Sequence, residues 1–89
     1  MTTRNVFENI ESAHEYVGLL CEALDEAAET IGEELVQPSV ASHPRREDAL
    51  RLVEHKLATL HGHLMKSRLL LNDLRTLRRY LLQERELVG

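Results

Sequence analysis

Hydrophobic residues recur at alternating spacings of three and four over the first part of the chain. The apolar or small residues of this stripe are Val6, Ile10, Ala13, Val17, Leu20, Leu24, Ala27, Ile31 and Leu35. Such spacing places side chains on one face of an α-helix. The pattern predicts an amphipathic helix over about residues 5–36, with Asn5 as its N-cap and Glu8 completing a capping box.

A second and longer helical pattern covers about residues 44–87. Its main stripe consists of Leu50, Val53, Leu57, Leu60, Leu64, Leu71, Leu74 and Leu81, and Leu69, Leu70, Leu77 and Leu82 widen it. Pro38 ends the first helix, because proline lacks an N–H and restricts the residue before it. Residues 37–43 therefore predict a short polar turn, and the whole chain, 1–89, predicts one domain with two antiparallel helices.

The two predicted helices differ in length. At about 1.5 Å per residue they span roughly 45 Å and 65 Å. With the turn near residue 40 or 41, residue i should face residue 81 − i, so the chain beyond Thr76 should extend past the first helix. This overhang is rich in apolar residues, namely Leu77, Tyr80, Leu81, Leu82 and Leu87. A large exposed apolar patch normally marks an interface.

The predicted fold is therefore all-α, an antiparallel two-helix hairpin with unequal helices that assembles as a homodimeric four-helix bundle. The partner expected for the overhang is a second copy of the chain. The residues predicted at this dimer interface are Leu70, Leu74, Leu77, Leu81 and Leu82.

Charge is distributed unevenly between the predicted helices. Residues 1–37 hold nine acidic residues and one basic residue, and the rest of the chain holds six acidic and ten basic residues. Opposite charges favour antiparallel packing of the two helices. Glu33 and Glu34 oppose the dipole of the first helix, and Arg45 and Arg46 oppose that of the second, so these residues should neutralise each other across the turn.

Composition limits the functional classes. The chain is 43% apolar and 3% aromatic, a balance typical of long helices. It shows no signal-peptide pattern and no run of about 18 apolar residues, so we expect a cytoplasmic protein without a membrane partner. Arg68, Asn72, Arg75 and Arg79 form a basic stripe, but the acidic first helix competes for it. The net charge of −4 and the scarcity of aromatic residues further disfavour nucleic-acid binding.

Five histidines raise the possibility of a metal site. His61 and His63 diverge by about 200° on a helix, so they do not bind one ion together. Glu11 and His14 have the Glu-x-x-His spacing that supplies ligands in ferritin-like di-iron bundles. The facing region offers no carboxylate, so a second subunit would have to supply one. We expect no metal or cofactor, with Glu11 and His14 as the alternative metal ligands.

Two further alternatives involve nucleophilic chemistry. Cys21 should lie near Leu60 and His61, and a Cys–His pair can form a reactive thiolate. No orienting third group is identifiable, so a small buried cysteine is the favoured interpretation, and no catalytic residue is predicted.

The stretch from His63 to Ser67, HLMKS, resembles the pattern around the phosphorylated histidine of histidine-phosphotransfer domains. The resemblance covers five residues and departs from the family at Ser67, where glycine is usual. It implies a phosphoryl carrier in which His63 accepts the phosphoryl group and Lys66, one turn along, offsets its charge. The leading prediction remains a small, non-enzymatic interaction or regulatory protein. The phosphoryl carrier and the metal-binding bundle are the alternatives.

Overall fold

The computed structural model describes the backbone of residues 3–88 and the side chains of residues 8–83. Three helices form within this range, and it contains no strand: α1 (Thr3–Leu35), α2 (Pro38–Ala41) and α3 (Pro44–Val88). The all-α prediction is confirmed. Asn5, the predicted cap, and Leu87, the last predicted overhang residue, lie outside the described side chains.

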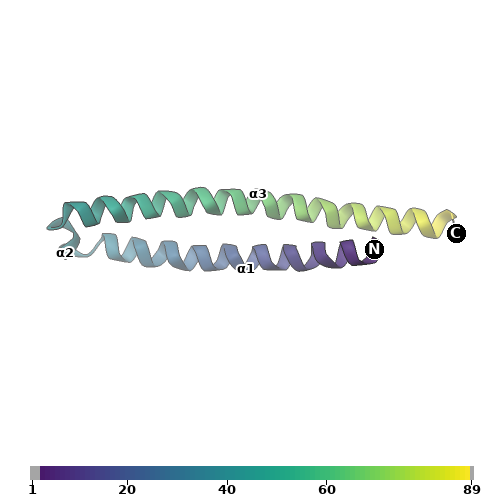
Figure 1. Cartoon of the computed structure of the whole chain (residues 1–89), viewed down its shortest axis with the longest axis horizontal. Helices are drawn as coiled ribbons and strands as arrows, with labels where there is room; N and C mark the ends of the chain where they lie inside the picture. Colours follow the sequence, from purple (N-terminus) through teal and green to yellow (C-terminus); the bar gives the residue numbers. More distant parts are fainter. Residues whose placement is uncertain (1–2, 89) are drawn as a thin grey trace.

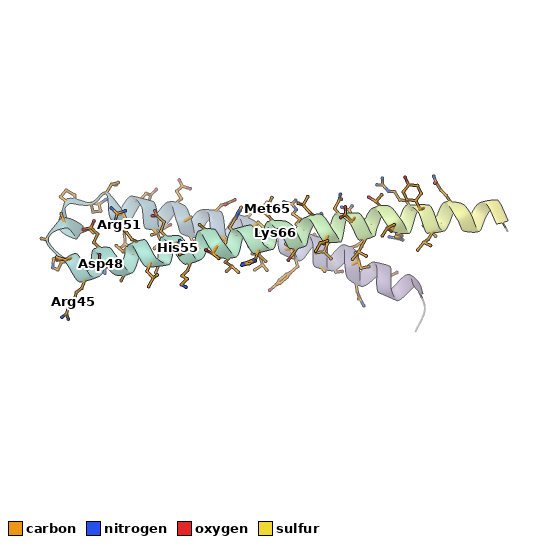
Figure 2. The ribbon with its side chains drawn as sticks, turned by 90° about the horizontal axis from the view of Figure 1, so that it is seen from above. Arg45, Asp48, Arg51, His55, Met65 and Lys66 are labelled. Carbon is orange, nitrogen blue, oxygen red and sulfur yellow. The ribbon has the colours of Figure 1, made fainter. Side chains whose placement is uncertain are left out.

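The helices α1 and α3 run antiparallel and side by side for most of the molecule (Figure 1). Their ribbons cross at a shallow angle when seen from above (Figure 2). The chain measures 71 × 18 × 17 Å and has a radius of gyration of 20.2 Å. A compact domain of this length would have a radius of about 12 Å. The molecule is therefore a rod, two helices thick.

The connector contains a helical turn where a polar turn was expected. Pro38 begins α2, and its fixed φ suits a first helical position. Backbone hydrogen bonds continue through the connector, from Val40 N to Gln37 O at 3.1 Å and from His43 N to Val40 O at 2.9 Å. Val40 is buried, with 4% of its surface exposed. The connector therefore supplies an apolar side chain to the closed end of the helix pair.

The register between α1 and α3 differs from the expected pairing. Side-chain contacts join Glu11 to Arg75 and Asp25 to His61, and Cys21 Sγ lies 4.0 Å from Met65 Sδ. The residue numbers in each pair add to 86 and not to 81. Side chains on a helix lean toward its N-terminus, so those of α1 lean away from the connector and those of α3 lean toward it. Contacting side chains therefore come from backbone positions that are not level.

This tilt corrects one expectation. Cys21 contacts Met65, and His61 pairs with Asp25, so Cys21 and His61 have different partners. The end of α3 extends past the start of α1 (Figure 1). Leu82, in this part of α3, lines a hollow together with Glu11 of α1.

Burial within this rod is sparse. Among the described apolar side chains, Cys21 and Val40 are each 4% exposed and Leu50 is 8% exposed, and these three form the buried core. The chain exposes 7279 Å² of surface. A compact monomer of 10.2 kDa would expose about 5300 Å². The two helices therefore leave roughly 2000 Å² more surface in water than a compact protein of this mass.

Candidate interaction surface

The face of α3 that points toward α1 alternates apolar and polar residues. Leu50, Leu57, Leu64 and Leu71 recur every seven residues, and each is buried or half-buried. Charged or polar residues stand between or directly after these leucines along the same face, namely Glu54, His61, Arg68 and Arg75. The seam between the two helices, which we call the inner seam, is therefore only partly apolar.

A second stripe of α3 lies one residue before each position of the inner seam. We call it the outer stripe, and it comprises Ala49, Val53, Lys56, Leu60, His63, Ser67, Leu70, Leu74, Leu77 and Leu81. Its spacing alternates between four and three throughout, which is the repeat of a helix that packs against another helix. Every residue of the outer stripe is exposed.

A matching stripe exists on α1. Gly18, Cys21 and Asp25 face α3, as their contacts with Arg68, Met65 and His61 show. The residues one position earlier form what we call the α1 stripe: Ile10, Ala13, Val17, Leu20, Leu24, Ala27 and Ile31. All of them are half-buried, so α3 covers the α1 stripe incompletely.

The outer stripe and the α1 stripe lie on the same side of the helix pair. Stepping back one residue rotates a side chain by about 100° around a helix. The two helices run in opposite directions, so these rotations have opposite senses when both are viewed from one end. Both stripes therefore turn toward the same flank. Together they form one continuous surface, which we call the apolar face.

The apolar face includes four of the five predicted interface residues. Leu70, Leu74, Leu77 and Leu81 belong to the outer stripe, and they are between 41% and 65% exposed. Leu82 differs, because it lies beside Glu11 and Arg75 on the inner seam. Near the connector the apolar face has an open hollow, which is lined by Ala49, Leu52, Val53, Lys56, Leu57 and Leu60.

Ion pairs set the alignment of α1 and α3. Arg46 Nη2 lies 2.6 Å from Glu34 Oε1, which confirms the expected neutralisation across the turn. Arg75 Nε donates to Glu11 Oε1 at 2.8 Å, so the basic stripe of α3 pairs with acidic α1 at this point. His61 Nε2 lies 3.2 Å from Asp25 Oδ1. These pairs are partly or largely exposed, so each contributes about 0–1 kcal/mol.

The alternative metal ligands, Glu11 and His14, have other neighbours. Arg75 occupies the Glu11 carboxylate, and His14 lines a shallow hollow with Met65, Arg68, Leu69 and Asn72. Within the described residues, no group of three or more His, Cys, Asp or Glu side chains is arranged to hold a metal ion. A metal at Glu11 and His14 would therefore require ligands from outside this part of the chain and the loss of the Arg75 pair.

The residues of the phosphotransfer alternative, His63 and Lys66, are both exposed on α3. The Ser67 hydroxyl donates to the backbone carbonyl of His63 at 3.0 Å. His63 belongs to the outer stripe, whereas Lys66 lies on the side of α3 away from α1 (Figure 2). A partner that covers the apolar face would also cover His63. Phosphotransfer from His63 and association through this face therefore compete.

The side of α3 opposite α1 carries several charged residues near the connector. Figure 2 views α3 from this side, with Arg45, Asp48, Arg51 and His55 along its connector half. Arg51 and Glu47 form an ion pair along the helix, with Nη2 and Oε1 3.3 Å apart. This charged side remains available when the apolar face is covered.

Sequence reasoning missed the division of α3 into two stripes, because it merged their leucines into one wide stripe. The strict seven-residue repeat of Leu50, Leu57, Leu64 and Leu71 was the available signal.

No family model, curated protein or solved structure matches this chain. No helix within residues 3–88 has an apolar stretch long enough to cross a bilayer.

Proposed function

We propose that this chain is a non-enzymatic interaction protein that works as a homodimeric four-helix bundle. In this proposal α1 and α3 form a hairpin, and a second copy covers its apolar face. The supporting observation is the apolar face itself, which is left in water although only three apolar side chains among the described residues are buried.

The size of the exposed surface supports a dimer. Each chain exposes roughly 2000 Å² more than a compact monomer of its mass. A stable protein–protein interface buries about 1200–2000 Å² in total, and obligate homodimers bury more. The burial of one leucine contributes about 1.5–3 kcal/mol, so the leucines of the outer stripe exceed all the ion pairs of the inner seam in energy.

The regulatory part of the proposal concerns the surfaces that the dimer leaves exposed. The polar side of α3, with Arg45, Asp48, Arg51 and His55, then faces outward in both copies (Figure 2). The acidic outer side of α1 does the same. A two-fold bundle would present each of these surfaces twice, which suits the binding of another protein.

Thermal unfolding at two concentrations tests the proposed dimer. When folding and dimer formation are coupled, a higher protein concentration stabilises the folded state by mass action. A rise from 1 μM to 100 μM should raise the Tm measured by circular dichroism by about 5–10 °C. A Tm that is the same at both concentrations would contradict the proposal.

A further inference from the structure

We infer that the two copies associate with their connectors at opposite ends, so that α3 packs antiparallel against the partner's α3 and α1 against the partner's α1. The two-fold axis passes at the level of the contact between Cys21 and Met65. This inference rests on the proposed dimer and adds its geometry.

The outer stripe can pack against the outer stripe of a second copy that runs in the opposite direction. When this antiparallel pairing is centred on residue 65, each residue lies opposite the partner residue for which the two residue numbers add to 130. The resulting layers join Ala49 to the partner's Leu81, Val53 to the partner's Leu77, Lys56 to the partner's Leu74, Leu60 to the partner's Leu70 and His63 to the partner's Ser67. All ten positions of the stripe find a counterpart in this register.

The two neighbouring registers are each less favourable. With the pairing centred on residue 65, His63 lies opposite the partner's Ser67, so an imidazole meets a hydroxyl. A shift by one heptad in one direction places all three polar residues of the stripe, Lys56, His63 and Ser67, opposite leucines of the partner. A buried polar group without a hydrogen-bond partner costs about 1–3 kcal/mol. A shift in the other direction leaves Leu77 and Leu81 without a counterpart on the partner's stripe.

The α1 stripes of the two copies can pair around the same two-fold axis. An antiparallel pairing centred on residue 22 places Ala13 opposite the partner's Ile31, Val17 opposite the partner's Ala27 and Leu20 opposite the partner's Leu24. Within one chain, Cys21 of α1 touches Met65 of α3. The side chains of residues 22 and 65 therefore lie at nearly the same height along the rod, and one two-fold axis serves both stripes.

The hollow near the connector receives a specific occupant in this arrangement. Its lining residues Ala49, Val53 and Leu60 lie opposite the partner's Leu81, Leu77 and Leu70. The leucine-rich end of one α3 therefore covers the connector end of the other. This accounts for the uneven outer stripe, which holds four leucines between residues 70 and 81 but one between residues 49 and 60.

The opposite arrangement places both connectors at one end of the dimer. In that dimer the outer stripe of α3 lies over the partner's α1 stripe. The leucines between residues 70 and 81 would then cover the part of the partner's α1 that is far from the connector, and they would not fill the hollow near the connector.

Distances between spin labels distinguish the two arrangements. Single cysteines would replace Asp48, His55 and Lys66, which lie on the exposed side of α3 (Figure 2), in chains that carry Cys21→Ala. Double electron–electron resonance then measures the label-to-label separation in each dimer. With connectors at opposite ends, the separation along the helix axis is about 50 Å for Asp48→Cys, about 30 Å for His55→Cys and about 3 Å for Lys66→Cys.

The outcomes separate this inference from the proposed dimer. A separation that falls steadily from Asp48→Cys to Lys66→Cys supports connectors at opposite ends. Equal separations at the three positions would overturn this geometry and leave the dimer intact, since labels at one height are then equally far apart. The absence of any dipolar signal would overturn both. A parallel set that retains the buried Cys21 reveals whether Cys21→Ala itself disturbs assembly.

Discussion

The inner seam and the apolar face of this molecule use different chemistry. The inner seam alternates leucines of α3 with small and charged residues, such as Gly18 and Cys21 on α1 and Arg68 and Arg75 on α3. The guanidinium of Arg68 lies 3.7 Å from the position that a Cβ on Gly18 would occupy, so a charged side chain fills space where a core residue would normally lie. The apolar face, in contrast, ends in four successive stripe positions that are all leucine, Leu70, Leu74, Leu77 and Leu81, and all four are exposed. The contacts within one chain therefore align the helices, while the proposed contacts between chains supply most of the energy.

The strongest test of this contrast is Leu74→Asp on the outer stripe. A carboxylate there would have to be buried in the dimer interface, so we expect monomers or unfolded chains. Leu81→Asp should behave in the same way. Sedimentation velocity measures the outcome directly.

The matched control is Leu69→Asp on the same helix. Leu69 is 64% exposed and lines the hollow beside His14, away from the apolar face. We expect this variant to remain dimeric. If Leu74→Asp and Leu69→Asp both sediment as the wild type does, the proposed interface is wrong.

A smaller effect is expected at the closed end of the helix pair. Val40→Ala removes two buried methyl groups from α2, which should lower the free energy of unfolding by about 1–2 kcal/mol. Val36→Ala is its control, because Val36 is 78% exposed and should change stability by less than about 0.5 kcal/mol. Urea unfolding of both variants at one protein concentration gives the comparison. Equal losses would show that α2 contributes no core packing.

Gly62 offers a change that should stabilise the chain without touching either surface. No side chain lies within 4 Å of the position that a Cβ on Gly62 would occupy. Gly62→Ala should therefore raise the free energy of unfolding by about 1 kcal/mol, because alanine favours the helix and glycine does not. A loss of stability in urea unfolding would mean that a partner chain approaches Gly62 closely.

The smallest predicted effect concerns an ion pair of the inner seam. Glu11→Gln, Arg75→Gln and the double variant form a mutant cycle. The two side chains are 43% and 34% exposed, so their coupling energy should be about 0.2–1 kcal/mol. Leucine burial should exceed this value several-fold. A coupling above about 2 kcal/mol would contradict the view that the inner seam mainly aligns the helices.

Several elements of the fold could be predicted from the sequence. The repeats of three and four predicted α1 and α3, because helical periodicity depends on local spacing alone. The charges of Glu34 and Arg46 predicted their pairing, since both oppose the dipoles of their own helices. Their closeness across a short connector made the pairing independent of register.

Other features depended on three-dimensional geometry that spacing does not contain. The pairing rule placed Glu11 opposite Leu70, whereas its partner is Arg75, because side chains of antiparallel helices lean in opposite directions. Val40 was placed in a polar turn, and its burial required the path of α2 back over the helix pair. The separation of the inner seam from the outer stripe likewise required knowing which leucines face α1.

The native mass of the wild-type chain is the most direct test of the central claim. Light scattering is suitable because it measures mass independently of shape, and this rod would elute anomalously from a sizing column. We predict twice the chain mass of 10.2 kDa at micromolar concentrations. A mass of one chain across the whole concentration range would contradict the claim and mean that the apolar face binds a different protein.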